Sequence, residues 1–277
     1  MFLTLNLGTL ERYRIPATNG RVSLRDIDPG DREGLPFDKA EAEAAMKADI
    51  EEIDRLQDIL YAQGKYAMLV ILQGMDASGK DSTIRTVFGP VDPLGAIAIS
   101  FKRPTEQELS HDFLWRIHKA VPPVRMIGIF NRSHYEDVVT VRVQGLVPPD
   151  RIELRYQAIN AFEKHLAENS VVVLKFFLHI SKKEQKERLQ ARLEDPTKRW
   201  KFSPDDLMTR KHWDDYMSAY QLALERCSTE WAPWFIIPSD RKWYRKAVVA
   251  RIVRSTLEAL DLAYPREMPG LDKIQIE

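Results

Sequence analysis

The sequence has 277 residues, 44% of them apolar, and 41 basic residues balance 41 acidic ones. This composition excludes a largely disordered chain, and the zero net charge gives no indication of binding to nucleic acid or to a membrane. The single cysteine, Cys227, excludes an intrachain disulfide and a zinc site of several cysteines, and with no signal-peptide or membrane-span pattern we expect a cytoplasmic protein.

The first segment of the chain, residues 1–36, is rich in Asp, Gly, Pro and Arg and has no sustained periodicity. We predict an irregular arm that either wraps the body of the protein or pairs with another subunit. From residue 37, apolar residues recur at spacings of three and four, which predicts a helix that ends at Gly64. Residues 37–277 contain no repeat, low-complexity tract or Gly/Ser linker, and we interpret them as a single domain.

Five short apolar runs predict buried parallel strands, because they are nearly continuous rather than alternating. They are residues 66–72, 96–101, 126–130, 171–180 and 235–237. Helical patterns lie between and after them, at residues 105–120, 150–168, 182–194, 204–226 and 241–263. Strands that alternate with helices predict an α/β fold with a parallel sheet covered on both faces.

The strongest motif is GMDASGKD at residues 74–81, which matches G-x-x-x-x-G-K between a predicted strand and a predicted helix. In such a loop, backbone N–H groups and the start of the helix surround an anion, and the lysine adds a full positive charge. The motif therefore predicts a phosphate site. Its expected phosphate contacts are Gly74, Ala77, Ser78, Gly79, Lys80, Asp81 and Ser82.

Two acidic side chains set this loop apart. Asp81 stands where a magnesium-binding Ser or Thr usually follows the lysine, and Asp76 lies inside the loop. Phosphate repels a carboxylate unless a metal lies between them. We predict that Asp76 is a Mg²⁺ ligand or a base for the acceptor, with helix capping as the alternative. An acid at Asp81 is favourable near a helix start whatever its function.

A second polar cluster, NRSHYED at residues 131–137, follows the predicted strand at 126–130. Ligands bind at the carboxyl ends of strands in parallel sheets, and a P-loop fold places an acid at the end of the neighbouring strand. We expect Arg132 to reach a phosphate, and Glu136 and Asp137 to be metal ligands or bases. A polar turn that starts a helix is the alternative. His134 is interpreted as a structural hydrogen-bonding residue.

Residues 182–211 hold ten basic and six acidic residues. Arginines on a mobile helix pair close over phosphates in P-loop kinases and stabilise the transferring group. The alternatives are a solvated helix face or, because Trp200 and Phe202 are interleaved, a nucleic-acid surface. The predicted polyphosphate or phosphate contacts in this window are Arg188, Arg192, Arg199 and Lys201. Arg103, after the strand at 96–101, is a candidate substrate contact.

Four blocks in order resemble the second family of polyphosphate kinases, and most closely its class III subgroup: GMDASGKD, FNRSHYEDV, residues 174–206 and residues 231–246. The resemblance runs from about residue 14 to the C-terminus. It implies a thymidylate-kinase-like α/β/α fold with a helical lid at about 182–211, and phosphate transfer from polyphosphate to nucleoside mono- and diphosphates with Mg²⁺, or Mn²⁺ as an alternative. It also implies a homo-oligomer, with a tetramer as the expected form.

The resemblance assigns roles residue by residue. The catalytic set is Asp76, Lys80, Arg132, Glu136 and Asp137; the metal set is Asp76, Glu136 and Asp137; the nucleotide contacts are Arg103, Asn131 and Arg132. Two other functions fit parts of the sequence. An ATP-dependent nucleoside monophosphate kinase would use the same loop, and a nucleotide-binding switch without phosphate transfer would need no carboxylates in the second block.

Overall fold

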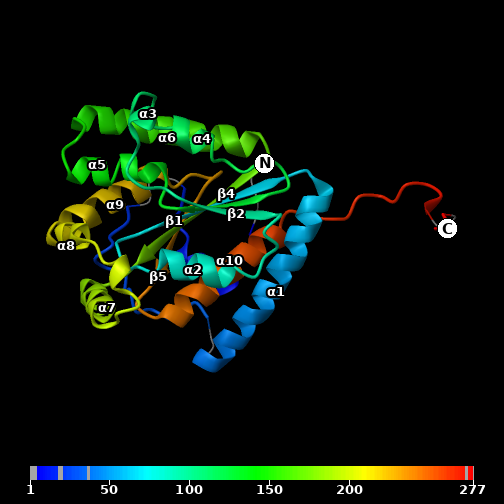
Figure 1. The fold of residues 1–277 in the computed structure, drawn as a ribbon, viewed down its shortest axis with the longest axis horizontal. Coiled ribbons are helices and arrows are strands. Elements are labelled where there is room, and N and C mark those ends of the chain that lie inside the picture. The colour runs from blue at the N-terminus through cyan, green and yellow to red at the C-terminus, as the bar shows by residue number, and fades with distance from the viewer. Residues whose placement is uncertain (1–4, 18–20, 36–37, 272–273, 277) are drawn as a thin grey trace.

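The computed structural model describes residues 5–17, 21–35, 38–271 and 274–276. At its centre is a sheet of five parallel strands in the order β2-β3-β1-β4-β5 (Figure 1). The strands are β1 Ala67–Gln73, β2 Ala96–Ser100, β3 Ile127–Asn131, β4 Val171–His179 and β5 Trp234–Pro238. The α/β class with a parallel sheet is thus confirmed, and each predicted apolar run matches a strand to within one residue at either end.

Helices cover both faces of this sheet. The α-helices are α1 Lys39–Gln63, α2 Lys80–Val87, α3 Glu106–Leu109, α4 Trp115–His118, α5 Thr140–Val143, α6 Pro149–Glu168, α7 Lys182–Glu194, α8 Pro204–Lys211, α9 Trp213–Cys227 and α10 Lys242–Glu258. The 3₁₀ helices are η1 Gly8–Tyr13, η2 His134–Asp137 and η3 Arg199–Lys201. In Figure 1, α1, α2 and α10 lie below the sheet and α4, α6 and α9 lie above it.

The central strand β1 shows why two helical layers form. Its seven residues are all buried. Met68, Val70 and Leu72 belong to the core on the α1–α10 side, whereas the alternate residues Leu69 and Ile71 belong to the core on the α6–α9 side. Successive side chains of a strand point to opposite faces, so a continuous apolar run needs cover on both.

Two predicted helices are interrupted in the structure. Residues 105–120 form the short helices α3 and α4, because the Asp112 side chain accepts the Leu114 N–H at 3.0 Å and turns the backbone between them. Residues 204–226 form α8 and α9, which meet at His212. The prediction of one continuous helix in each region was wrong, since an apolar pattern does not reveal a local hydrogen bond that competes with the helix.

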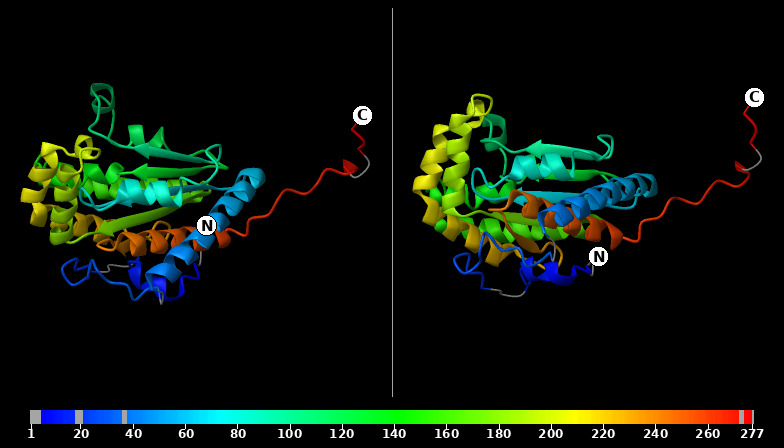
Figure 2. Two further views of the ribbon diagram at one scale, coloured as in Figure 1. Left: turned by 60° about the horizontal axis from the view of Figure 1, so that its bottom comes forward. Right: turned by 90° about the horizontal axis from the view of Figure 1, so that it is seen from below.

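The described part of the N-terminal segment packs against its own chain. The Ile15 N–H donates to the Trp234 carbonyl at 2.8 Å, and Arg14 forms an antiparallel bridge with Phe235, so this segment covers the outer edge of β5. At the other end, the chain leaves α10 and runs as an extended segment away from the body (Figure 2). Within the described ranges, no helix combines the length and the apolar character needed to cross a membrane.

Candidate active site

The loop between β1 and α2 has the backbone conformation that its glycines predict. Gly74 and Gly79 have φ angles of 145° and 108°, and Ala77 has a φ of 63°. A Cβ atom at Gly79 would lie 2.3 Å from Cζ of Arg245. Glycine is therefore required at residue 79 both for its backbone angle and for the close approach of a buried guanidinium.

The side chain of Lys80 folds back over this loop. Its Nζ donates to the carbonyls of Gly74 at 2.7 Å and Met75 at 3.2 Å. Burial, together with the positive charge of Arg132, lowers the pKa of Lys80 to about 8. A phosphate placed at the loop would supply the compensating negative charge, and Lys80 is thus poised to bind it.

Two arginines hold the loop in place by hydrogen bonds. Arg245 of α10 donates to the Ser78 carbonyl, to Oγ1 of Thr83 and to Oγ of Ser82, at 2.8–2.9 Å. Burial, with Arg188 nearby, lowers the pKa of Arg245 to about 9. The sequence analysis missed Arg245. It lies in an ordinary helical pattern, and its partners are more than a hundred residues away.

Arg188 of α7 is the second support. Its Nη1 donates to the carbonyls of Ala77 and Ser78, its Nη2 to those of Ser239 and Asp240, and its Nε to Glu184. These bonds occupy the full fork of donors that a guanidinium has. In this arrangement Arg188 shapes the loop through its carbonyls, whereas the sequence predicts a direct phosphate contact.

We expect Arg245→Lys to destabilise the protein by about 1–3 kcal/mol, because an ammonium cannot reproduce the forked contacts of the guanidinium. Binding of pyrophosphate to the loop should weaken in parallel. Denaturant unfolding and titration calorimetry measure the two effects. Arg241→Lys is the matched control, since exposed Arg241 makes one long bond, 3.4 Å, to the Gly30 carbonyl. Equal effects in the two variants would contradict this role for Arg245.

Arg132 connects the second polar cluster to the loop. Its Nη2 lies 2.5 Å from Oδ1 of Asp76, and its Nη1 lies 3.5 Å from Oε2 of Glu136. The charge of Glu136, with that of Asp76, raises the pKa of Arg132 despite its burial. Arg132 has a φ of 63°, which turns the chain as it leaves β3. The structure therefore brings together three predicted residues from two strands.

A second contact joins the same two segments. Nδ2 of Asn131 donates to Oδ1 of Asp81 at 2.8 Å. Asp81 thus links the start of α2 to the end of β3, in addition to its favourable place near a helix start. Ser82 is held in place from the other side by Arg245.

Asp137 is placed differently from its neighbour Glu136. Its carboxylate lies 3.6 Å from Arg116 and 3.7 Å from Arg155, and burial raises its pKa. Glu136 accepts a hydrogen bond from Thr140 at 2.7 Å and lies beside Arg132. The turn of η2 separates the two adjacent acids, so the structure groups Glu136 with the loop and Asp137 with two arginines.

A fully buried polar network lies beneath the second cluster. Nζ of Lys175 is 2.5 Å from Glu163 and donates to the Tyr135 hydroxyl at 2.8 Å. His134 lies 3.2 Å from the same carboxylate. Burial of Glu163 opposes its ionisation, but Lys175 and His134 together hold its pKa below its usual range. The prediction that His134 is a structural hydrogen-bonding residue agrees with this position.

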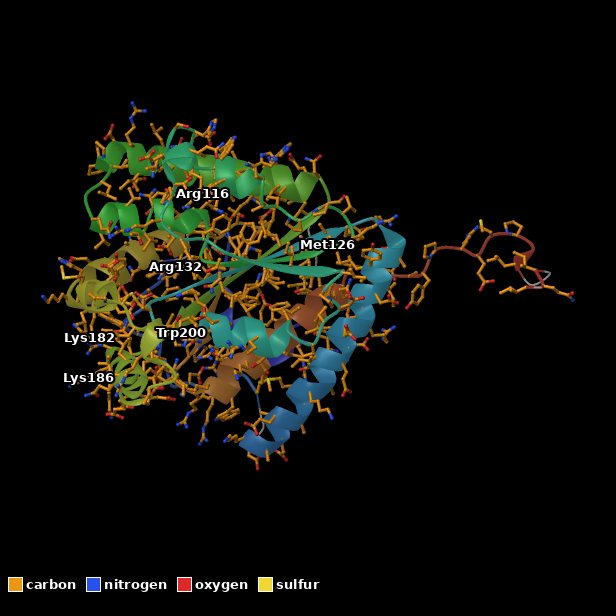
Figure 3. All side chains as sticks on the ribbon, viewed as in Figure 1. Arg116, Met126, Arg132, Lys182, Lys186 and Trp200 are labelled. Atoms are coloured by element: carbon orange, nitrogen blue, oxygen red, sulfur yellow. The ribbon has the colours of Figure 1, made fainter. Side chains whose placement is uncertain are left out.

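Residues 182–211 form the α7–α8 hairpin, which contains α7, η3 and α8. Figure 3 shows Lys182 and Lys186 on α7, at the side of the molecule where Arg132 lies. Nε2 of Gln185 donates to the Asp76 carbonyl at 3.0 Å, which joins the hairpin to the loop. Arg192 lies 3.6 Å from Asp206, whose pKa is raised by burial and by the charge of Asp76.

Three other predicted residues lie outside this group of contacts. The Arg199 Nε donates to the Leu193 carbonyl, and Lys201 lies over the exposed ring of Trp200. Arg103 is 86% exposed and 3.9 Å from Asp205 of the hairpin. Their assignment as phosphate or nucleotide contacts stays a prediction.

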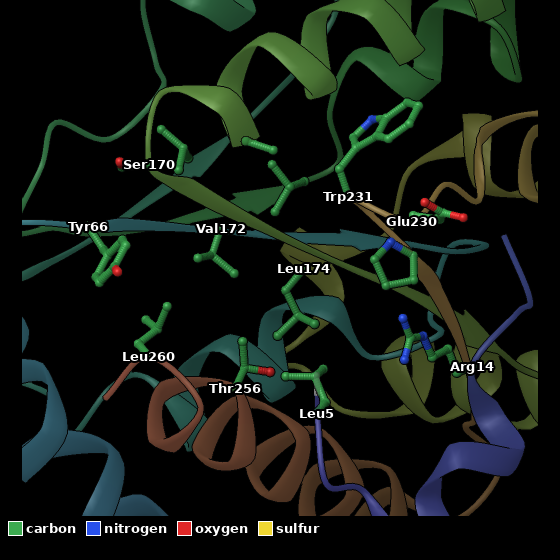
Figure 4. Close-up of a pocket in the computed structure, with 14 residues that line it drawn as sticks. Leu5, Arg14, Tyr66, Ser170, Val172, Leu174, Glu230, Trp231, Thr256 and Leu260 are labelled. Carbon is green, nitrogen blue, oxygen red and sulfur yellow. The ribbon is translucent and has the colours of Figure 1, made fainter. Parts of the chain in front are cut away.

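A cavity at the opposite end of the sheet is distinct from this site. It lies at the start of β4, has a volume of about 40 Å³, and is lined mainly by apolar residues, among them Val172, Leu174 and Leu260 (Figure 4). Arg14 and Glu230 lie at one side. Because ligands of parallel sheets bind at the carboxyl ends of the strands, the loop and the second cluster form the better candidate active site.

The carboxylates at the loop can be tested as ligands of a divalent metal. Among the described residues, no three His, Cys, Asp or Glu side chains are grouped closely enough to enclose an ion. Mg²⁺, however, usually takes one or two protein carboxylates and completes its octahedron with water and substrate phosphates. Asp76 and Glu136, on either side of Arg132, supply hard oxygen atoms of this kind, so these residues fit such a metal.

Residues 36–265 match the model of the family described as Polyphosphate kinase 2. An AMP/ADP-polyphosphate phosphotransferase of Meiothermus ruber is 47% identical over 268 residues, which cover 97% of this chain and 100% of that protein. An ADP-polyphosphate phosphotransferase of Rhodopseudomonas palustris is 41% identical over 240 residues, covering 82% of this chain and 83% of that protein. The crystal structure of Polyphosphate Kinase 2 from Arthrobacter aurescens is similar, with a TM-score of 0.91 and 42% identity, over 96% of this chain and 94% of that one. The P-loop, the second polar cluster and these matches show that the chain belongs to the polyphosphate kinase 2 family.

Proposed function

We propose that this protein is a polyphosphate-dependent nucleotide kinase. It transfers the terminal phosphate of inorganic polyphosphate to nucleoside mono- and diphosphates, reversibly and in the cytoplasm. AMP and ADP are the acceptors in the names of the two relatives, and we extend the proposal to GMP and GDP. The observation that carries it is a P-loop with an acid inside it, Asp76, in a chain that matches two named polyphosphate phosphotransferases over 97% and 82% of its length.

The residues of the site suit direct in-line transfer between phosphates. Lys80 and the backbone N–H groups of the loop hold the terminal phosphate of the donor, and Arg132 neutralises charge on the group that is transferred. Asp76 positions the nucleotide that accepts the phosphate. Arg188, Arg192, Arg199 and Lys201 belong to the basic hairpin that we propose as a lid over the polyphosphate. No covalent intermediate on the protein is needed.

Magnesium is the proposed cofactor, and manganese has the same preference for oxygen ligands. Asp76 and Glu136 are the proposed ligands, with Asp137 available only if its ion pairs with Arg116 and Arg155 open. When bound, the ion shields the phosphate charges from the carboxylates and from one another. In its absence Arg132 holds the two carboxylates in place by charge.

The test is a donor assay with purified protein. Short-chain polyphosphate with AMP and Mg²⁺ should yield ADP and then ATP, and chelation of the metal should stop the reaction. ATP paired with nucleoside monophosphates tests the alternative of an ATP-dependent nucleoside monophosphate kinase. Turnover with ATP but none with polyphosphate would overturn the proposal. Nucleotide binding with no turnover from either donor would favour a switch protein.

The lowered pKa of Lys80 predicts how donor binding depends on pH. Above about pH 8 the free lysine loses its proton, so the KM for polyphosphate should rise from about pH 7 to about pH 9. Bound phosphate favours the charged form, so kcat at saturation should change less. In Lys80→Arg the guanidinium stays charged, and the KM of that variant should lose this pH dependence whatever its absolute activity. A constant KM in the wild type contradicts the prediction.

A further inference from the structure

An irregular stretch of chain, residues 101–105, joins β2 to α3 at the carboxyl edge of the sheet. In the strand order, the P-loop follows the central strand β1, and the α7–α8 hairpin follows β4 on one side of it. The ends of β3 and β2, on the other side, are left for the nucleotide, because ligands bind where the strands of a parallel sheet end. We therefore name residues 101–105 the acceptor segment.

The sheet holds the first residue of the acceptor segment. The Phe101 N–H donates to the Asn131 carbonyl at 3.0 Å, and the Phe101 ring packs edge-on against Phe130. Lys102 and Arg103 are exposed, and within the described residues the next hydrogen bond to this backbone comes from a side chain. An exposed, irregular segment of this kind is mobile unless a contact ties it down.

That side chain is Arg116 of α4, which is buried (Figure 3). Its Nη1 donates to the Lys102 carbonyl at 2.9 Å, and its Cζ lies 5.5 Å from the centre of the Phe101 ring. Its Nη2 lies 3.6 Å from Asp137 in the second polar cluster, and its Nη1 lies 4.0 Å from Glu108 of α3. One buried guanidinium, balanced by two carboxylates, therefore ties the acceptor segment to the end of β3 and to α3.

The acceptor segment also reaches the hairpin. Arg103, one residue beyond the anchored carbonyl, lies 3.9 Å from Asp205 of α8. Both side chains are exposed, so this ion pair by itself contributes little to holding the segment. Arg116 therefore fixes the backbone from which Arg103, a predicted nucleotide contact, extends toward the hairpin.

We propose that Arg116 is a positioning residue for the nucleotide acceptor. By binding the Lys102 carbonyl and lying beside Asp137, it holds the acceptor segment against the second polar cluster before the nucleotide arrives. The nucleotide then does not have to order this segment, which lowers the free-energy cost of binding. The role of Arg116 rests on the proposed function, in which the acceptor is a nucleoside mono- or diphosphate.

The test replaces Arg116 by lysine, which keeps the charge but has no fork to contact the Lys102 carbonyl and Asp137 together. The KM for AMP should rise about tenfold or more, because the bond from a charged donor is lost. The KM for polyphosphate and kcat should stay within about twofold of the wild type. A general loss of structure would instead change both Michaelis constants and lower kcat, so an equal rise in both constants overturns the proposal.

Arg155→Lys is the matched control, because Arg155 shares the partner Asp137 but lies on α6. Its Nη1 lies 3.7 Å from the Asp137 carboxylate and donates to the Asp137 carbonyl at 2.8 Å. In the described ranges it has no hydrogen bond or ion pair with the acceptor segment. This variant should keep the KM for AMP within about twofold of the wild type. An equal rise in the two variants would assign the effect to Asp137 and overturn the role of the segment.

Limited proteolysis measures the position of the segment without turnover. Trypsin cleaves after Lys102, whereas Pro104 protects the bond after Arg103. Cleavage at Lys102 should be several-fold faster in Arg116→Lys than in the wild type or in Arg155→Lys, because the released segment fits a protease more readily. Equal cleavage rates in the three proteins overturn the proposal.

Calorimetric titration with AMP separates this proposal from the proposed function. If the wild type binds AMP but transfers no phosphate from polyphosphate, the donor assignment fails, and a tenfold loss of AMP affinity in Arg116→Lys still supports Arg116. Unchanged AMP affinity in that variant, or no AMP binding by the wild type, overturns the role of Arg116. Pro104→Gly loosens the exposed segment and leaves the buried charges intact, so it covers the case of a poorly folded Arg116→Lys. It should weaken AMP binding alone, and unchanged AMP affinity would count against the segment.

Discussion

Replacing Asp76 by asparagine is expected to lower kcat with polyphosphate and AMP by about a thousand-fold or more. The variant keeps the shape of the side chain but removes its charge. The proposed metal loses a ligand, and Arg132 loses the partner that lies 2.5 Å away. This carboxylate interacts with charge that shifts while the phosphate is transferred. The substitution should therefore change kcat more than the KM for polyphosphate. Initial-rate measurements at saturating Mg²⁺ check this.

The control for this prediction is the same substitution at an exposed position. Asp214→Asn, on α9, should have wild-type activity, because Asp214 is exposed and far along the chain from both polar clusters. Both variants should unfold at temperatures close to that of the wild type. If Asp76→Asn retains near-normal turnover, Asp76 is neither a metal ligand nor the residue that positions the acceptor.

Replacing Lys175 by methionine is expected to destabilise the protein by about 3–5 kcal/mol, because it leaves a buried carboxylate without its counter-ion. Lys175 and Glu163 are both fully buried, and Nζ also donates to the Cys227 carbonyl at 2.7 Å. Methionine fills a similar volume, so loss of the charge and its hydrogen bonds dominates. Denaturant unfolding with linear extrapolation measures the difference in the free energy of unfolding.

A surface pair supplies the comparison. Lys47→Met removes an exposed partner of Glu51, 3.9 Å away on α1, and should cost less than about 1 kcal/mol. Adding Glu163→Gln to Lys175→Met should recover part of the lost stability, because a neutral amide is less costly to bury than an unpaired carboxylate. A Lys175→Met variant no less stable than Lys47→Met would show that Glu163 is compensated by other groups.

The elements of the fold could be predicted because their signals are local. An apolar run such as residues 66–72 needs only itself to be identified as a buried strand, and GMDASGKD is one continuous motif. Gly64 marks the end of α1 in the structure, and Gly79 within the motif marks the start of α2. The break between α3 and α4 was missed because the Asp112 side chain decides it, and apolar spacing carries no information on that bond.

The site could be predicted from the sequence only through the types of residue that follow the predicted strands. Asp76, Arg132 and Glu136 were expected near one another, and the structure brings them together. What the sequence could not reveal depends on contacts between distant segments. Arg245 reaches the loop from α10, and Asp137 turns toward Arg116, although Glu136 beside it in the chain does not. Adjacent acids look equivalent until the turn between them is known.

The burial of Cys227 provides a chemical reporter of how often the protein opens. It is the one thiol in the sequence, it is fully buried at the end of α9, and burial raises its pKa to about 12. A thiol reagent can therefore modify the chain only when this region unfolds, and the labelling rate measures that opening. Ligands that bind the native state slow the labelling in proportion to their saturation. The affinity of polyphosphate can thus be measured without turnover, including in variants such as Asp76→Asn that no longer react.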